Sequence, residues 1–188
     1  MGVDMARNAG VVIAFGDSVT STGSATALYP KGTRREEETS SDRGVETFRY
    51  VYFDNGSGNV AAAAGALAYR GKTPANFWDV TSDVSDVDSA FAAGVFQSAL
   101  TDECYGWIKT KGYESALKKK TGSGYGWTRG DVLHAAAATD GEAQPLVTAA
   151  ATKVSKAELK AVLERVVGYA AATVSSTTAS GAAYIDLE

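Results

Sequence analysis

The fold is decided by the stretch Glu46-Thr47-Phe48-Arg49-Tyr50-Val51-Tyr52-Phe53-Asp54, which runs directly into Asn55-Gly56-Ser57-Gly58. In the first part, Phe48, Tyr50 and Tyr52 alternate with the residues between them, which is the period of two that marks a β-strand. The second part consists of residues that tolerate positive φ angles, which indicates a turn. A strand that ends in a tight turn predicts β structure in this part of the chain.

The rest of the chain repeats this rhythm of short apolar runs separated by turn residues. The further predicted strands are Phe91–Gln97, Cys104–Thr110, Gly112–Leu117, Asp131–Ala135, Val166–Thr173 and Ala182–Leu187. The alanine-rich run Val60–Tyr69 fits a helix or a strand by pattern, and the neighbouring strands favour extended structure. Many short strands at this spacing are typical of a small β-sandwich or barrel.

One α-helix is predicted near the C-terminus. Ser155 and Glu158 form a capping-box pattern, and apolar residues then recur at helical spacing up to Val166, just before Gly168. Its expected role is to cover one face or end of the sheet. The predicted fold class is therefore mainly β, with a small sandwich or barrel, an extended N-terminal arm and one C-terminal α-helix.

The arm is expected because of the composition of residues 16–44. This segment is rich in Ser, Thr, Gly and charged residues, including Arg34-Arg35-Glu36-Glu37-Glu38, and its main apolar residues are Leu28 and Tyr29. Alone, so few apolar groups do not offset the entropy that ordering the segment costs. We expect residues 1–44 to form an arm that orders on a partner, and residues 45–188 to form a β-rich core domain.

The composition also excludes several classes of protein. A chain of 188 residues with 45% hydrophobic residues and a net charge of -4 fits one globular domain without a basic nucleic-acid surface. No apolar run approaches the roughly 18 residues of a membrane span, and Met1–Gly10 lacks the features of a secretory signal, so we expect synthesis in the cytosol. Cys104 is the only cysteine, which rules out an intrachain disulfide or a Cys-rich zinc site. We expect neither a cofactor nor a metal.

Two charged stretches have ordinary interpretations. The aspartates of the first are Asp79, Asp83, Asp86 and Asp88. This stretch lacks the glycine and terminal glutamate of a calcium-binding EF-hand loop, which favours a solvated loop. The basic run Lys118-Lys119-Lys120 predicts an exposed edge or loop, where lysines discourage pairing with other strands.

A catalytic alternative rests on the run Val11-Val12-Ile13-Ala14-Phe15-Gly16-Asp17-Ser18-Val19-Thr20, which resembles the first block of the GDSL or SGNH hydrolase family. Asp131 and His134 have that family's Asp-x-x-His spacing. A hydrolase would use Ser18 as nucleophile, His134 as general base and Asp131 as the acid that orients it. The family's Gly-x-Asn-Asp block is missing, however, and one predicted helix is too few for its helix-flanked parallel sheet. We therefore expect no enzyme and keep the serine hydrolase as an alternative.

Nine short blocks form a broader pattern. They are Leu28–Thr33, Glu46–Gly56, Ala63–Gly65, Val80–Ser85, Ala93–Asp102, Tyr105–Tyr113, Gly130–Leu133, Thr139–Gly141 and Val167–Ala170. Taken in order, they resemble tailed-bacteriophage virion proteins of the capsid decoration, or cement, family. The resemblance extends from Leu28 towards the C-terminus and departs from the family pattern at Lys156–Arg165, where the predicted helix looks inserted.

This resemblance implies a β-rich virion protein without catalytic activity. It would bind the outer surface of the major capsid protein shell and stabilise the head, as a homo-oligomer for which a trimer is preferred. The family's binding residues do not transfer one by one to this sequence. A third hypothesis is a receptor- or glycan-binding virion module that uses exposed aromatic residues such as Trp107 and Trp127.

Overall fold

The computed structural model consists largely of strands, which confirms the mainly β class. The residues that the structure describes are 5–8, 11–14, 16–39, 44–55, 61–70, 77–86, 91–136, 139–146 and 166–187. The strands are β1 (Met5–Asn8), β2 (Val11–Ala14), β3 (Arg34–Glu38), β4 (Val45–Phe53), β5 (Leu67–Arg70), β6 (Asp79–Thr81), β7 (Ala92–Phe96), β8 (Cys104–Lys118), β9 (Val132–Ala135), β10 (Ala143–Pro145), β11 (Val166–Ala170) and β12 (Ser180–Asp186). Within these ranges the only helix is the short 3₁₀ turn η3 (Val84–Asp86).

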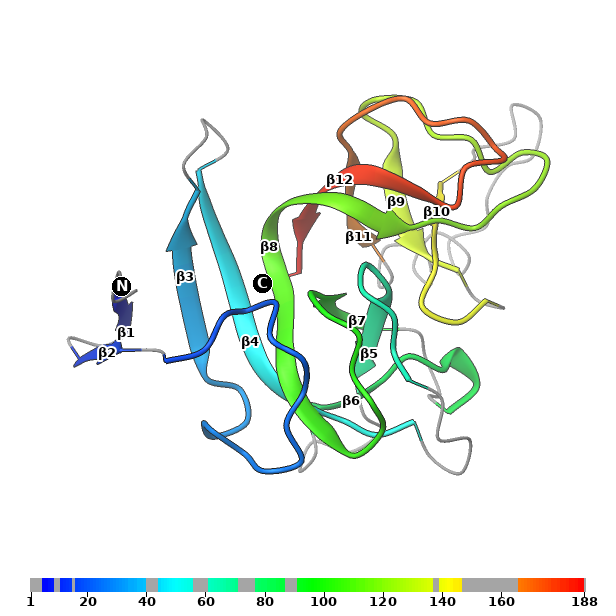
Figure 1. The fold of residues 1–188 in the computed structure, drawn as a ribbon. Coiled ribbons are helices and arrows are strands. Elements are labelled where there is room, and N and C mark those ends of the chain that lie inside the picture. The colour runs from blue at the N-terminus through cyan, green and yellow to red at the C-terminus, as the bar shows by residue number, and fades with distance from the viewer. Residues whose placement is uncertain are drawn as a thin grey trace.

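Five strands close into a barrel (Figure 1). Their order is β4-β6-β5-β7-β8, and β8 closes the ring by pairing with β4. All of these pairs are antiparallel except the parallel pair of β4 and β6. Of the two predicted architectures, the barrel is therefore the one that the chain adopts.

The barrel is one part of a ten-stranded sheet, and the long strand β8 joins it to the other part, which we call the second sheet. Its first part, Cys104–Lys111, pairs with β4 of the barrel, and its second part, Lys111–Lys118, pairs with β12. Gly112, near the start of the second part, has a φ angle of 113°, where a residue with a side chain would be strained. From β8 the second sheet continues in the order β12-β11-β9-β10 (Figure 1). Because both sheets share one strand, they are joined by continuous backbone pairing.

The alternation predicted for β4 is confirmed. Val51 and Phe53 point into the barrel, where they pack in its apolar cluster with residues such as Phe96. Phe48 and Tyr50 belong to a different buried cluster on the outer face. Both faces of this strand are therefore covered, and something other than the barrel must cover the outer one.

The outer face of β4 and β8 is covered by residues 16–33, which we call the strap. Ser24 and Tyr105 exchange backbone hydrogen bonds of 3.0 and 2.8 Å, which fix the strap to β8. Further along, β3 lies in the expected arm and pairs with β4, which lies in the expected core domain that begins at residue 45. The strap and β3, which belong to the expected arm, therefore lie on the barrel of their own chain, whereas β1 and β2 pair with each other in a separate two-stranded sheet.

The predicted C-terminal helix is not settled by the fold. Its residues from Ser155 to Arg165 lie outside the described residues. Val166, the last residue of the predicted apolar stripe, is the first residue of β11. The predicted helix therefore stays a prediction.

The lysine run was predicted to be exposed, and for Lys119 this is wrong. The Lys119 side chain is fully buried, and its Nζ donates to the carbonyl oxygens of Lys120 at 2.9 Å, Tyr125 at 3.0 Å and Ser176 at 3.4 Å. Burial lowers the pKa of this ammonium group, while the charge of Glu142 acts in the opposite direction. The group holds three backbone segments together at the end of the second sheet.

Candidate functional site

Ser18 lies in an exposed turn of the strap. Its carbonyl accepts a hydrogen bond from Ser21 N at 3.0 Å, and its Oγ lies 2.9 Å from Thr20 Oγ1. A serine hydroxyl that bonds to a residue two positions later is a common turn device. The local contacts of Ser18 are those of a turn residue.

His134 and Asp131 take part in other contacts. His134 Nε2 lies 3.2 Å from the Gln144 side-chain nitrogen, and Nδ1 lies 3.0 Å from the Ala135 carbonyl. The Asp131 carboxylate accepts a hydrogen bond from Thr128 N at 2.6 Å. The described residues include no hydrogen bond from Ser18 or Asp131 to His134, so the relay that the hydrolase hypothesis needs is not assembled.

Asp17, beside Ser18, is the residue that fixes the strap. Its carboxylate accepts hydrogen bonds from Tyr29 Oη at 2.7 Å and from Trp107 Nε1 at 2.9 Å. The Arg35 guanidinium lies 3.9 Å from the same carboxylate and donates to the Asp17 carbonyl at 2.7 Å. One carboxylate therefore joins the strap, β3 and β8, and the resemblance of Gly16-Asp17-Ser18 to a catalytic block coincides with a structural anchor.

This arrangement predicts opposite outcomes for two adjacent substitutions. Asp17→Ala removes the carboxylate that accepts from the Trp107 N–H and the Tyr29 hydroxyl. It also removes one of the negative charges near Arg35, which keeps its hydrogen bond to the carbonyl of residue 17 and its ion pair with Glu37. We therefore expect the free energy of unfolding to fall by about 2–4 kcal/mol. Ser18→Ala removes only exposed turn contacts, so we expect a change within about 0.5 kcal/mol. Urea unfolding of both variants measures the difference. A large loss in Ser18→Ala with none in Asp17→Ala would show that the anchor is misassigned.

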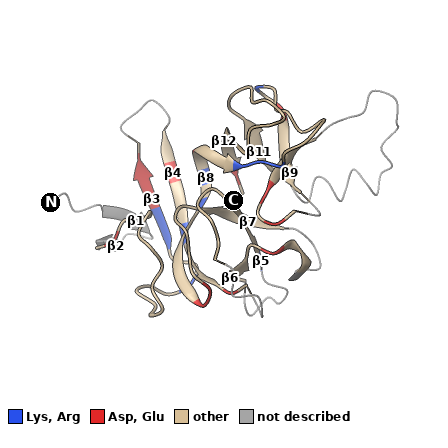
Figure 2. Ribbon diagram, turned by 45° about the vertical axis from the view of Figure 1, so that its right-hand side comes forward, with Lys and Arg blue, Asp and Glu red and all other residues tan. Residues whose placement is uncertain are grey.

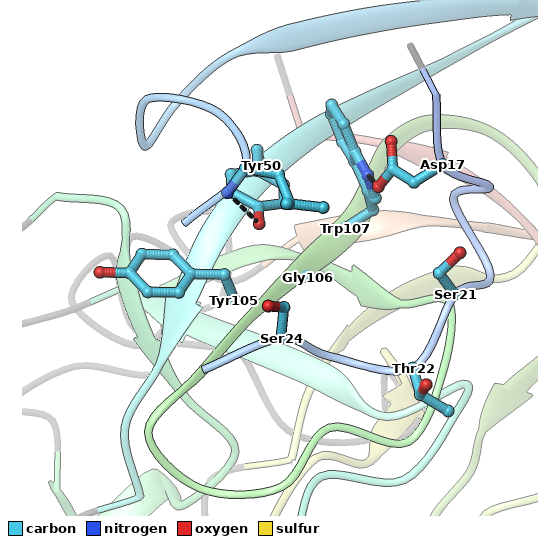
Figure 3. A pocket seen from close by; sticks show the side chains of 9 residues that line it. Asp17, Ser21, Thr22, Ser24, Tyr50, Tyr105, Gly106 and Trp107 are labelled. Atoms are coloured by element: carbon cyan, nitrogen blue, oxygen red, sulfur yellow. Dashed lines mark hydrogen bonds between the residues drawn. The ribbon is translucent and has the colours of Figure 1, made fainter. Parts of the chain in front are cut away.

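The hollow beside this anchor is too small for a substrate. It has a volume of about 30 Å³ between the strap and β8, where Figure 3 shows Asp17 and Trp107 directed towards each other. Such a space holds about two water molecules, whereas pockets for small-molecule ligands are typically at least about tenfold larger. We therefore interpret it as a packing defect at the edge of the strap.

The prediction that Trp107 and Trp127 are exposed is wrong, because each side chain is only 1% exposed. Trp107 packs with Tyr50 at a ring-centroid distance of 5.1 Å, under the strap. Trp127 belongs to the core cluster of the second sheet, and its Nε1 is buried without a hydrogen-bond partner in the described structure. Neither ring is available to stack on a glycan.

The Tyr29 hydroxyl gives the anchor a pH dependence. Its pKa is raised above the usual value near 10, first by burial and then by the hydrogen bond to Asp17. The folded protein therefore holds this proton more tightly than the unfolded chain, and the associated stability is present below about pH 10 and lost as the pH rises through the folded pKa.

We expect Tyr29→Phe to lower stability at neutral pH and to reduce the further loss as the pH rises above about 10. Urea unfolding at each pH measures both effects. An equal alkaline loss in the parent and in the variant would contradict the role of this hydroxyl.

Among the residues that the structure describes, the most accessible aromatic side chains lie on the second sheet instead. Tyr169 of β11 is directly opposite Tyr184 of β12, and Tyr184 is directly opposite Tyr113 of β8. Residues opposite each other on adjacent strands share a face of the sheet. Tyr169 and Tyr184 are 50% and 48% exposed, and the rings of Tyr113 and Tyr184 meet edge to face at 5.6 Å. We call Tyr113, Tyr169 and Tyr184 the tyrosine row.

Charged groups border the tyrosine row. Asp186 lies two residues beyond Tyr184, opposite Lys111 of β8, and both are exposed. An aromatic centre with a charged border is the usual anatomy of a protein interface. The row was not predicted from the sequence. The alternation of Tyr184 with the apolar Ala183 and Ile185 indicates that Tyr184 faces away from the core, but it does not show that the other two tyrosines of the row lie beside it.

No metal site accompanies these groups in the part of the chain that the structure describes, where His, Cys, Asp and Glu side chains do not gather in threes. Of the aspartates considered for calcium, Asp79 pairs with Lys31 and Asp83 bonds to Ser85. Within the same ranges there is no helix with the length and apolar character to cross a membrane.

Comparison with known proteins found no matching family model, no matching curated protein and no matching solved structure.

Proposed function

We propose that this protein is a decoration, or cement, protein of tailed-phage heads. In this proposal it binds the outer surface of the major capsid protein shell, stabilises the head and has no catalytic activity. It is made in the host cytoplasm and works on the capsid exterior as a homo-oligomer, for which we prefer a trimer. Light scattering coupled to size-exclusion chromatography measures the oligomeric state.

The observation that carries the proposal is the exposed tyrosine row. Tyrosines are enriched at protein interfaces, because each ring buries a large area at a small cost in side-chain entropy and keeps a polar end. Here Tyr169 and Tyr184 are about half exposed on a sheet that shares β8 with the barrel. A rigid sheet holds such side chains in place before binding, which reduces the entropy cost of association.

The contacts of the hydrolase candidates favour adhesion over catalysis. Asp17 fixes the strap, Ser18 stabilises a turn, and the His134 ring bonds to Gln144. An esterase assay of the parent and of Ser18→Ala separates the two functions. We expect no turnover above the uncatalysed rate in either protein, and activity that disappears with Ser18→Ala would overturn the non-catalytic assignment.

The proposal is tested by adding the purified protein to heads assembled without it. We expect the protein to co-sediment with the heads and to raise their melting temperature in proportion to occupancy, because a ligand that binds only the assembled state stabilises that state. Heads that bind the protein but melt unchanged would refute the cement role and leave the virion location intact. Absence of co-sedimentation would refute the binding itself.

A further inference from the structure

Two arginines and two aromatic rings meet on the barrel, and none of them belongs to the tyrosine row. The guanidinium carbons of Arg49 and Arg70 lie 5.3 and 5.9 Å from the ring centroid of Trp78. Arg70 also lies 4.1 Å from the ring centroid of Phe77, and the Phe77 and Trp78 rings are perpendicular at 5.0 Å. We call Arg49, Arg70, Phe77 and Trp78 the arginine–aromatic cluster.

Backbone pairing brings the cluster together. Arg70 ends β5 and pairs with Val80 of β6, and Trp78 directly precedes β6. The indole lies over Gly32 of the strap, where an added Cβ would be only 2.3 Å from Trp78 Nε1. Because strap, barrel and ring are in contact, the cluster is formed before any ligand binds.

Among the described residues, no carboxylate pairs with Arg70. Arg49 donates to the Gly32 carbonyl at 3.1 Å, and the nearby carboxylate of Asp79 is paired with Lys31 at 2.5 Å. The Arg70 guanidinium lies against the rings of Phe77 and Trp78. Burial lowers the pKa of Arg70, and the charge of Arg49 lowers it further. A partly buried guanidinium with another positive charge beside it is stabilised by an anion that lies next to it.

We propose that the arginine–aromatic cluster binds a carboxylate of an acidic peptide segment on a partner protein. A guanidinium stacked on an aromatic ring keeps its N–H edge free, and that edge matches a carboxylate with two parallel hydrogen bonds. Phe77, which is 39% exposed, adds an apolar surface for a neighbouring side chain of the peptide. This site is separate from the tyrosine row and does not depend on a role in phage heads.

A peptide carboxylate fits the cluster better than a nucleic acid. Aromatic rings and arginines also bind single strands, but those sites follow the phosphate backbone with an extended basic groove. In this chain the net charge is -4, and Figure 2 shows that the basic residues at the start of β3 are followed directly by acidic residues at its end. The two guanidinium groups are enough to pair with one or two carboxylates, but they are too few to bind a chain of phosphates.

The test is the fluorescence anisotropy of a labelled hexaglutamate peptide at low salt. We expect binding to the parent, a loss of at least about tenfold in affinity for Arg70→Gln, and an intermediate affinity for Arg70→Lys, which keeps the charge without the planar edge. Arg129→Gln removes the same charge from an exposed turn and is the matched control, with an expected change of less than about twofold.

Thermal unfolding distinguishes a binding role from a structural one. Since Arg70 is partly buried beside Arg49, we expect Arg70→Gln to melt at the parent temperature or above it. A clear fall in melting temperature would assign Arg70 to the fold and overturn the proposal. It is also overturned if the parent does not bind the peptide, if Arg70→Gln binds it equally well, or if a labelled oligothymidine binds the parent more tightly than the peptide does.

Discussion

Replacing Trp107 with alanine is expected to lower the free energy of unfolding by about 3–5 kcal/mol, the usual cost of removing a large aromatic side chain from a core. The ring is 1% exposed, packs against Tyr50 and Tyr29, and lies under the Arg35 guanidinium at 5.7 Å. Its removal would leave a cavity between the strap and β8. Chemical unfolding, with the midpoint and slope compared between variants, measures the loss.

Trp107→Phe is the matched control, because it keeps an aromatic ring and removes the N–H that donates to Asp17. We expect about 1–2 kcal/mol of destabilisation, which is the cost of a lost hydrogen bond to a charged group and a partial cavity. A loss below about 1 kcal/mol in Trp107→Ala would mean that the strap is not held by this cluster.

The double substitution Tyr169→Ser and Tyr184→Ser is expected to lower the affinity for heads by at least about tenfold. Truncating aromatic side chains at the centre of an interface usually costs more than other substitutions, and both side chains lie on one face of adjacent strands. Because each is about half exposed in the free protein, we expect folding to survive the loss of the edge-to-face contact between Tyr113 and Tyr184. Co-sedimentation at several protein concentrations gives the affinity.

Phe91→Ser is the control for this experiment. Phe91 is an aromatic residue of similar exposure, at 40%, and it precedes β7 of the barrel rather than lying on the second sheet. We expect this variant to bind heads like the parent. If Phe91→Ser and the double tyrosine variant lost binding equally, a general loss of exposed apolar surface would explain the result. The tyrosine row would then not be the surface that binds heads.

Local patterns predicted the strands well. In β4, the alternation of side chains separated Val51 and Phe53 from Phe48 and Tyr50, because side chains of a strand alternate between its faces whatever the fold. The segments Cys104–Thr110 and Gly112–Leu117 were predicted as two strands, and they form one strand that bends at Gly112. A glycine at this position is compatible with either the end of a strand or a bend within one. The pairing of β8 with β4 before the glycine and with β12 after it determines that the strand continues.

The contacts that order the strap could not be predicted, because they join residues that are distant in the sequence. Asp17 and Trp107 are separated by 90 positions. Composition suggested that residues 16–44 lack enough apolar groups to fold alone, and the structure supplies the missing surface from the outer face of β4 and β8. The burial of Lys119 has the same origin, since its carbonyl partners include Ser176 on a distant turn.

For the candidate sites, too, the sequence indicated residue types but not the contacts between distant residues. Sequence patterns singled out Ser18, His134 and Asp131 by type and spacing, but spacing does not specify which strands carry them or what they contact. Aromatic character singled out Trp107 and Trp127, and both are buried. The tyrosine row depends on the register of β8, β12 and β11, which is fixed by backbone pairing across three segments.

Tyrosine nitration followed by mass spectrometry, on the free and on the head-bound protein, tests the proposed adhesion surface most directly. In the free protein we expect Tyr169 and Tyr184 to react readily, and the buried Tyr50 and Tyr69 to be protected. On heads, we expect Tyr169 and Tyr184 to become protected as well. If both reacted equally fast in the free and in the bound state, the tyrosine row would not be the surface that contacts the capsid.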